Sequence, residues 1–218
     1  MADDHLVMLP SVALRRSEAL KRVATVLVDH GFTFDGGARA LHWDAELDSF
    51  AYDDEDDRDL EGLGSIEAAL AVSVDWERIC LDFQGISSNW ELHASRGPTP
   101  DECTVALSFP HSLYRLCSAE VQTARQLLFV LNDVREVLSV EQLACGTETP
   151  TPGWSARQLD HFIQTQLQAH SGPTPTMHTL LLTRARERQL RNTLALGDAW
   201  HSFDLTTEAV ALSQLRVQ

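Results

Sequence analysis

Apolar residues recur at helical spacing in two long segments of this chain, 11–30 and 118–138. Such a repeat is typical of an amphipathic helix that buries one face. Gly31 directly follows the first segment and is a natural helix terminator, while Ser118 is suited to cap the second. We therefore predict two long helices. Their apolar stripes consist of Leu20, Val23, Ala24 and Leu27 in the first and of Val121, Ala124, Leu128, Leu131, Val134 and Leu138 in the second.

Between these helices, apolar and polar residues alternate as they do in strands that have one buried face. The alternation predicts three strands, at 74–83, around Trp90 and Leu92, and at 105–109. The links between them are short, so we expect an antiparallel meander. The alternation is interrupted near Arg78, which predicts a bulge in the first of the three strands.

Two weaker signals precede this meander. Segments 38–43 and 47–52 follow a turn at 35–37 and are predicted to pair as a hairpin. The apolar run 65–72 fits either a short helix or a strand. A helix is favoured, because Ser65 can cap its first turn.

The composition changes at residues 145–153, which are rich in proline and threonine. This composition predicts a linker or a long loop. Directly after this segment, Ser155 and Gln158 have the spacing of a capping box at the start of another helix. Residues 179–190 fit a helix or a strand, and we favour a helix. A further helix is expected from Thr206 onward.

These elements predict an α+β fold. An antiparallel sheet of about five strands would be packed by the two long helices, because one face of such a sheet needs an apolar cover. We assign residues 1–145 to this α+β domain. Residues 154–218 are predicted to form a mainly helical C-terminal part, either docked on the sheet or folded as a small second domain.

The charge of the chain is concentrated in one acidic block, residues 44–61. Ten of its eighteen residues are carboxylates and only Arg58 opposes them, so the block carries −9 of the formal net charge of −15. Carboxylates this close repel one another, and the block must therefore be solvated or meet a cation. Tyr52 lies beside these charges and is a candidate anchor for a partner, whereas Phe50 is predicted to face the core.

The remaining composition narrows the class of protein. Apolar residues make up 44% of the chain, which is ordinary for a globular protein, and no apolar run is long enough to cross a bilayer. The N-terminal residues lack the positive charge of a secretory signal. Four scattered cysteines without a CxxC pair predict buried thiols in a reducing cytoplasm. Only one of the seventeen basic residues is lysine, which indicates a GC-rich genome and hence a bacterium.

The sequence contains no GxSxG, HExxH or glycine-rich phosphate-binding motif. His111 follows a predicted strand and is the histidine best placed for a site, with Cys117 close behind it, but a buried thiol is the simpler interpretation. The nearest fit to a calcium-binding loop starts at Asp57, has Gly62 at the glycine position and fails at its closing residue, Ala68. We therefore predict no catalytic residue, no metal ligand and no cofactor.

A local basic patch stands apart from the acidic block. On a helix, three of its four arginines would share one face. The patch has three interpretations: a solvated surface, a contact with phosphate or with an acidic surface of another subunit, or a segment that folds back on 44–61. Its members are Arg184, Arg186, Arg188 and Arg191.

Together these features favour a non-enzymatic acidic binding protein that engages a basic protein partner, a toxin or an effector, and neutralises or chaperones it. Bacterial immunity proteins, inhibitors and secretion chaperones are classes of this kind. A net charge of −15 argues against direct binding to nucleic acid or to an anionic membrane, while a homo-oligomer is compatible with it. The alternatives are a divalent-metal-dependent enzyme that uses the carboxylates of 53–59 and an inhibitor that mimics nucleic acid. The residues predicted to bind the partner are Asp48, Tyr52, Asp53, Asp54, Glu55, Asp56, Asp57, Asp59 and Glu61.

Overall fold

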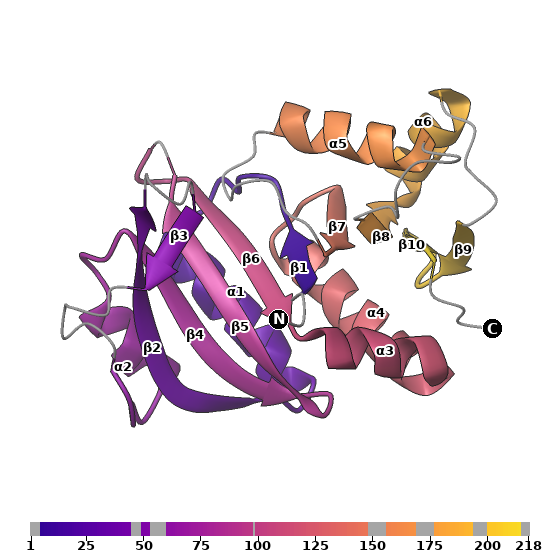
Figure 1. Ribbon diagram of the computed structural model, residues 1–218. Helices are drawn as coiled ribbons and strands as arrows, with labels where there is room; N and C mark the ends of the chain where they lie inside the picture. The colour runs from indigo at the N-terminus through magenta and orange to yellow at the C-terminus, as the bar shows by residue number, and fades with distance from the viewer. Residues whose placement is uncertain are drawn as a thin grey trace.

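The computed structural model describes residues 5–44, 49–52, 60–97, 99–147, 156–168, 177–193 and 200–214, which are built around one large β-sheet (Figure 1). Its strands are β1 (His5–Met8), β2 (Thr33–Asp44), β3 (Ser49–Tyr52), β4 (Arg78–Gly85), β5 (Ser88–Arg96), β6 (Cys103–Phe109), β7 (Gln142–Gly146), β8 (Met177–Thr183), β9 (His201–Asp204) and β10 (Ala209–Ser213). The helices are α1 (Arg16–Asp29), α2 (Ile66–Val72), α3 (His111–Ala119), α4 (Val121–Val137), α5 (Ala156–Gln168) and α6 (Arg184–Thr193).

The ten strands follow the order β3-β2-β4-β5-β6-β1-β7-β8-β10-β9, and each of these neighbouring pairs is antiparallel. The short strand β1 lies within the sheet, where Val7 is opposite Leu107 of β6 on one side and Cys145 of β7 on the other. The prediction of about five strands is therefore wrong. The sheet is larger because β1 joins the N-terminal strands to a second set of strands from the C-terminal part of the chain.

The C-terminal part is not mainly helical, which corrects a second feature of the predicted fold. Residues 179–190 are divided between β8 and α6, and β10 lies where a helix was predicted from Thr206. All of Ala209–Ser213 is buried, so this strand lacks the alternation that marks a half-exposed strand. The sheet also continues across the predicted boundary between 1–145 and 154–218, and the division into two domains stays a prediction.

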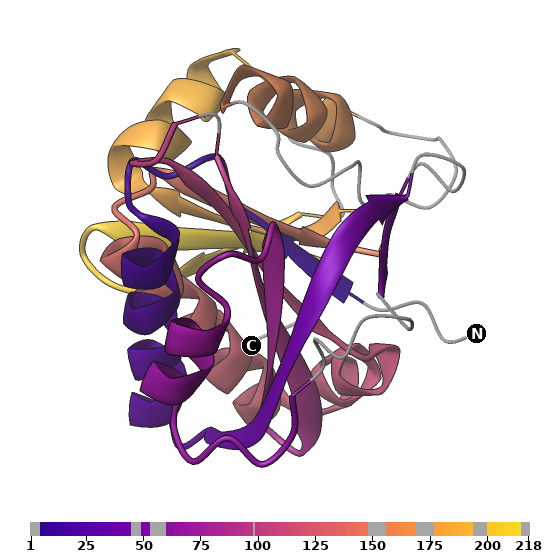
Figure 2. The same cartoon turned by 90° about the vertical axis from the view of Figure 1, so that its left-hand side faces the viewer.

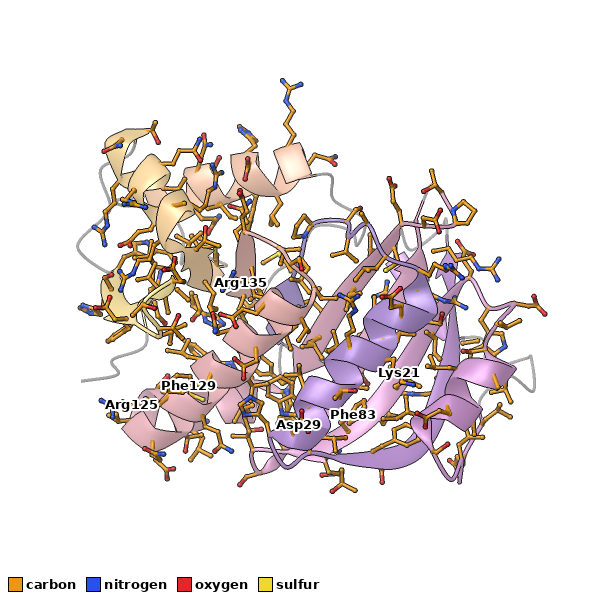
Figure 3. All side chains as sticks on the ribbon, turned by 180° about the vertical axis from the view of Figure 1, so that it is seen from behind. Lys21, Asp29, Phe83, Arg125, Phe129 and Arg135 are labelled. Atoms are coloured by element: carbon orange, nitrogen blue, oxygen red, sulfur yellow. The ribbon has the colours of Figure 1, made fainter. Side chains whose placement is uncertain are left out.

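Helices α1 and α4 cover one face of the sheet, here called the helix-covered face (Figure 2). Figure 3 views this side, with Lys21 and Asp29 along α1 and Arg125, Phe129 and Arg135 along α4. Their apolar stripes pack on alternate residues of the central strands, as an amphipathic helix requires. The resulting core includes Leu20, Leu27, Leu127 and Leu131 from the helices and Ile79, Leu81, Trp90, Leu92 and Leu107 from the strands.

Helices α5 and α6 pack on the opposite face, over the C-terminal strands (Figure 1). A second apolar cluster forms there. It is made of Leu159, Ile163 and Leu167 from α5, Leu190 from α6, and Leu180, Leu182, Val210 and Leu212 from β8 and β10. The sheet is therefore covered on different faces by different helices, and the second face of the N-terminal strands is left for polar side chains.

Several local predictions in the N-terminal part are confirmed. The β2–β3 hairpin and the β4–β5–β6 meander both form. The Ser65 hydroxyl caps α2 by accepting a hydrogen bond from the amide of Ala68. The predicted bulge near Arg78 is wrong, because β4 begins at that residue. A shift of register lies instead in β2, between Phe34 and Ala38.

Two helix boundaries differ from those predicted. Helix α1 begins at Arg16 because Val12, inside the predicted helix, forms a bridge with Cys103. The segment after β6 forms α3 before the chain turns into α4, so Ser118 lies in the last turn of α3 and does not cap a helix. This additional helix covers the end of the sheet next to β1 and β6 (Figure 1).

The predicted linker 145–153 begins later than its composition indicates, because Cys145 is a buried residue of β7. Residues 148–155 lie outside the described residues, and with them Ser155 of the predicted capping box. Gln158 is in the first turn of α5, at the position that the capping box gives it.

The turn between β4 and β5 has left-handed backbone at two residues other than glycine. The angle φ is +46° at Ile86 and +57° at Ser87, and Gly85 pairs with Ser88 across the turn. Two-residue hairpin turns of this geometry favour asparagine and glycine, because a side chain is strained at positive φ. This turn fixes the register of the hairpin that carries the polar cluster described below.

We expect Ser87→Gly to raise the free energy of unfolding by about 0.5–1 kcal/mol, because glycine adopts positive φ without strain. Ser88→Gly is the matched control and should lower the stability instead, since residue 88 already belongs to β5. Urea denaturation measures the free energy of unfolding of the two variants and checks the direction of each change. A Ser87→Gly variant less stable than the wild type contradicts the turn geometry.

Candidate functional site

Two residues of the acidic block are paired at one edge of the sheet. Tyr52 of β3 is opposite Leu41 of β2, and Leu60 forms a bridge with Ala38 of the same strand. Strand β2 therefore has a partner on each side of segment 53–59, which lies outside the described residues. Glu61, the last of the predicted partner-binding residues, is exposed. The predicted residues that lie outside the described residues are Asp48, Asp53, Asp54, Glu55, Asp56, Asp57 and Asp59.

Strand β3 is the outermost strand at this edge and pairs with β2 alone among the described strands. Its outer side thus presents backbone N–H and C=O groups to a further strand. Natural proteins protect such edges with charged residues, and in the sequence carboxylates both precede and follow β3.

A second group of polar side chains lies on the N-terminal strands, on the face opposite α1. The residues form two rows across the sheet, because residues opposite one another in antiparallel strands share a face. One row runs through Arg39, Cys80 and His93 of β2, β4 and β5, and the other through Asp82, Glu91 and Ser108 of β4, β5 and β6. We call these six residues the Glu91 cluster.

Glu91 is the centre of this cluster. Its Oε1 accepts a hydrogen bond from Arg39 Nη2 at 2.8 Å, and its Oε2 accepts from Ser108 Oγ at 3.2 Å and from His93 Nε2 at 3.1 Å. The hydrogen bond from His93, with help from Arg39, outweighs burial and lowers the pKa of Glu91 to about 2. The carboxylate is therefore ionised at neutral pH, and Arg39 also pairs with Asp82.

The thiol and the imidazole of the cluster are held in their neutral forms. Burial raises the pKa of the Cys80 thiol well above its usual range and lowers the pKa of the His93 imidazole. Ser108 and Glu91 both lie at Nε2 of His93, at 3.4 and 3.1 Å, so the imidazole is not placed between them as in a catalytic triad. The arrangement does not activate Ser108 or Cys80 as a nucleophile.

The same cluster nevertheless holds a set of metal-ligand atoms. One ligand atom each from Cys80, Glu91 and His93 lie within 4.8 Å of one another. A pocket of about 390 Å³ borders the cluster at Glu91 and Ser108. Its rim is rich in hydroxyl and amide groups, from Ser87, Ser88, Asn89 and Ser112.

Three histidines, of which His5 and His178 are buried and His111 is half-buried, form a separate chain of hydrogen bonds between the two sets of strands. His5 of β1 lies 2.9 Å from His111 of α3 through Nε2 and 2.8 Å from His178 of β8 through Nδ1. The ring of Tyr114 stacks on His5 and packs at a tilt against His178, with ring centroids 4.6 and 4.3 Å apart. Burial, followed by the neighbouring His5 and His111, lowers the pKa of His178 to about 3. Cys145 Sγ completes the group, 3.7 Å from His178 Nε2.

His111 therefore belongs to a cluster, as its position after a strand suggests, but its partner is His5 and not Cys117. Burial raises the pKa of Cys117 to about 12, so this thiol is protonated at neutral pH. The pairing of His111 with Cys117 as a catalytic thiol finds no support. All four cysteines are free and buried.

Among the described residues, the basic patch is paired with acids of the C-terminal part. Three of its arginines form ion pairs on or near α6, and Arg188 is exposed. The pairs are Arg184 with Glu187 and Asp204, Arg186 with Asp160, and Arg191 with Glu187. These pairs are not among the three interpretations of the patch, and a contact with 44–61 stays a prediction because most of that block lies outside the described residues.

Sequence reasoning missed the Glu91 cluster, although a signal for it exists. Glu91 and His93 are two residues apart, so on a strand they share a face. A two-residue turn at Ile86 and Ser87 places Cys80 opposite His93, as observed. Recognising the turn requires accepting isoleucine and serine at positive φ, where glycine and asparagine are usual.

Comparison with known proteins gives no assignment for this site. No family model matches the chain, and no curated protein or solved structure matches it. No helix among the described residues is long and apolar enough to span a membrane. The function is therefore argued from the residues of this chain.

Proposed function

We propose that this chain is a non-enzymatic cytoplasmic binding protein, which uses its acidic block to engage and neutralise or chaperone a basic protein partner such as a toxin or an effector. The observation that carries the proposal is the placement of the block. Tyr52 and Leu60, which lie on either side of segment 53–59, are both paired with β2 at the outer edge of the sheet. The block carries −9 of the net charge of −15.

The charge of the block is suited to a partner because the arginines of the basic patch are paired with other acids of the chain. Arg184, Arg186 and Arg191 are paired with Asp160, Glu187 and Asp204 at the other end of the sheet. A concentrated negative field steers a basic partner toward the edge and raises the association rate more than the affinity. The outer side of β3 can then accept an extended basic segment as an additional strand.

Two further observations support this class of function. The buried polar groups that resemble catalytic sets, at the Glu91 cluster and around His178, hold their thiol and imidazole groups in neutral forms. Four buried free thiols also fit a reducing compartment.

The proposal predicts salt-dependent binding of basic extended peptides. A short peptide in which lysine or arginine alternates with valine or threonine should bind at low salt and lose most of its affinity at high salt. A peptide with glutamate in place of the basic residues is the matched control and should not bind. Fluorescence anisotropy measures both. Equal binding of the two peptides, or affinity that salt leaves unchanged, contradicts the proposal.

A further inference from the structure

We propose that Cys80, Glu91 and His93 form a binding site for one thiophilic divalent cation of the zinc type. The three ligand atoms lie within 4.8 Å of one another on a rigid part of the sheet. Cys80 and His93 are directly opposite each other in β4 and β5, and Glu91 is two residues from His93 on the same face. Cys80 and His93 are both buried, so the site is shielded from bulk water.

The chemistry of the donor set selects the metal. Sulfur, imidazole nitrogen and carboxylate oxygen are the three ligand types that Zn²⁺ combines in proteins, whereas Ca²⁺ and Mg²⁺ take oxygen ligands. The site therefore differs in kind from the acidic block, whose carboxylates suit only the harder cations. Burial raises the pKa of Cys80, so the free thiol keeps its proton. A thiophilic ion can still bind the sulfur, because the Zn–S bond replaces the S–H bond and the proton is released to solvent.

The observed separations are close to those of a tetrahedral site. His93 Nε2 and Glu91 Oε2 are 3.1 Å apart. Two ligands at bond lengths of about 2.0–2.1 Å from a tetrahedral ion are separated by about 3.3 Å. The Cys80 sulfur, at a bond length of about 2.3 Å, needs to approach both to about 3.6 Å, which is a side-chain movement on the order of 1 Å.

Arg39 and Asp82 are suited to the outer shell of this site. Arg39 binds Oε1 of Glu91 at 2.8 Å and orients the carboxylate. The ion takes the place of the proton between His93 Nε2 and Glu91 Oε2, and the neutral imidazole then carries its proton on Nδ1. Arg39 Nη2 is also 3.4 Å from Cys80 Sγ, where a guanidinium stabilises a thiolate. The thiolate and Glu91 offset the ion, and Asp82 offsets Arg39. The buried Arg78 adds one positive charge near Cys80 and His93.

Three protein ligands leave one coordination position for a water molecule or an added ligand. Ser108 lies next to this position, with Oγ 3.2 Å from Glu91 Oε2 and 3.4 Å from His93 Nε2. Glu91 and Ser108 also line the pocket of about 390 Å³, so the fourth position opens into that pocket. The open position gives an ion at this site access to small ligands.

Titration of the full-length reduced protein with Co²⁺ and Zn²⁺ tests this inference. Co²⁺ should bind once per chain and give the absorption of a cobalt–thiolate bond, and Zn²⁺ should displace it. Cys80→Ser should abolish that absorption and weaken Zn²⁺ binding on the order of 100-fold or more. His93→Gln should also weaken binding, while Cys103→Ser, which removes a buried thiol outside the cluster, should leave binding unchanged.

A second measurement uses the unaltered chain and does not depend on the folding of a variant. Stoichiometric Zn²⁺ should raise the melting temperature of the wild type, and an equal concentration of Mg²⁺ should not. Neutralising Asp53, Asp54, Asp56 and Asp57 together should leave the cobalt–thiolate absorption intact. The inference is overturned if no such absorption is seen, if it survives in Cys80→Ser, or if neutralising the acidic block removes it.

Discussion

The free energy of unfolding is expected to fall by about 2 kcal/mol or more when the pH is lowered from about 7.5 to about 5. The cause is His178, which burial and the neighbouring His5 and His111 hold at a pKa of about 3. In the unfolded chain the same imidazole has an ordinary pKa of about 6.5. Between these two values the unfolded state binds a proton that the folded state excludes, so acid favours unfolding.

The surroundings of His178 explain why the folded protein excludes this proton. His5 lies at one ring nitrogen and Thr179 at the other, and the ring of Tyr114 packs against the imidazole at a tilt. The titratable groups that face His178 are His5 from β1, His111 and Tyr114 from α3, and Cys145 from β7, and none of these four is a carboxylate. The stabilisation is fully present above about pH 6.5 and is lost progressively as the pH falls toward 3.

Urea denaturation at a series of pH values measures this effect, and NMR titration of the His178 ring assigns it. The variant His178→Gln should flatten the pH dependence by about 2 kcal/mol over the same range. His161, an exposed residue of α5, provides the matched control His161→Gln, which should keep the dependence of the wild type. An imidazole of His178 that titrates at or above 6.5 would disprove the account of the cluster.

A loss of similar size is expected from Glu91→Gln in the presence of a chelator. The substitution keeps the shape of the side chain but removes the charge that faces Arg39 and the strongest acceptor for His93 and Ser108. Removing one partner from a partly buried ion pair leaves the other uncompensated. Because Glu91 is about one-third exposed, we place the loss at about 2 kcal/mol, below the range for fully buried pairs.

Glu18→Gln is the control for this prediction, because Glu18 pairs with Arg22 on the exposed surface of α1. It should cost about 0.5 kcal/mol or less. The difference between Glu91→Gln and the wild type should also vanish in acid. The carboxylate of Glu91 contributes its stability above about pH 4.5 and loses it as the pH falls toward its folded pKa of about 2. A loss for Glu91→Gln equal to that for Glu18→Gln shows that the Glu91 cluster is not a coupled network.

The sequence predicts the helices and strands whose apolar periodicity is visible within the segment itself. It does not predict strands whose burial depends on residues far away in the sequence. Helices α1 and α4 and the strands β4 to β6 each pack one apolar face into the core and carry mainly polar residues on the other, so their periods are visible in the sequence. Strand β1 has only four residues, and β10 is buried on both faces, so neither shows a period. Their places in the sheet follow from long-range pairing, which forms between residues more than a hundred positions apart in the case of β1 and β7.

The candidate sites also differ in whether the sequence alone predicts them. The acidic block is a run of neighbouring residues and is evident from composition, and the structure adds that Tyr52 and Leu60 within it both pair with β2. The Glu91 cluster and the histidine chain are assembled from different strands, and their residues are scattered in the sequence. His5 and His178 approach to 2.8 Å only because β1 lies within the sheet, which local patterning does not predict.

The most direct test of the proposed function is the association rate of a basic extended peptide with two variants of equal net charge. One carries asparagine at Asp53, Asp54, Asp56 and Asp57. The other neutralises four exposed acids elsewhere, none of which forms a salt bridge within the described parts of the chain: Asp29, Asp75, Glu141 and Glu208. Because steering depends on where the charge lies, the first variant should associate about tenfold more slowly at low salt and the second within about twofold of the wild type. Equal rates for the two variants would show that net charge alone acts, and that the acidic block at the β3 edge is not a docking surface.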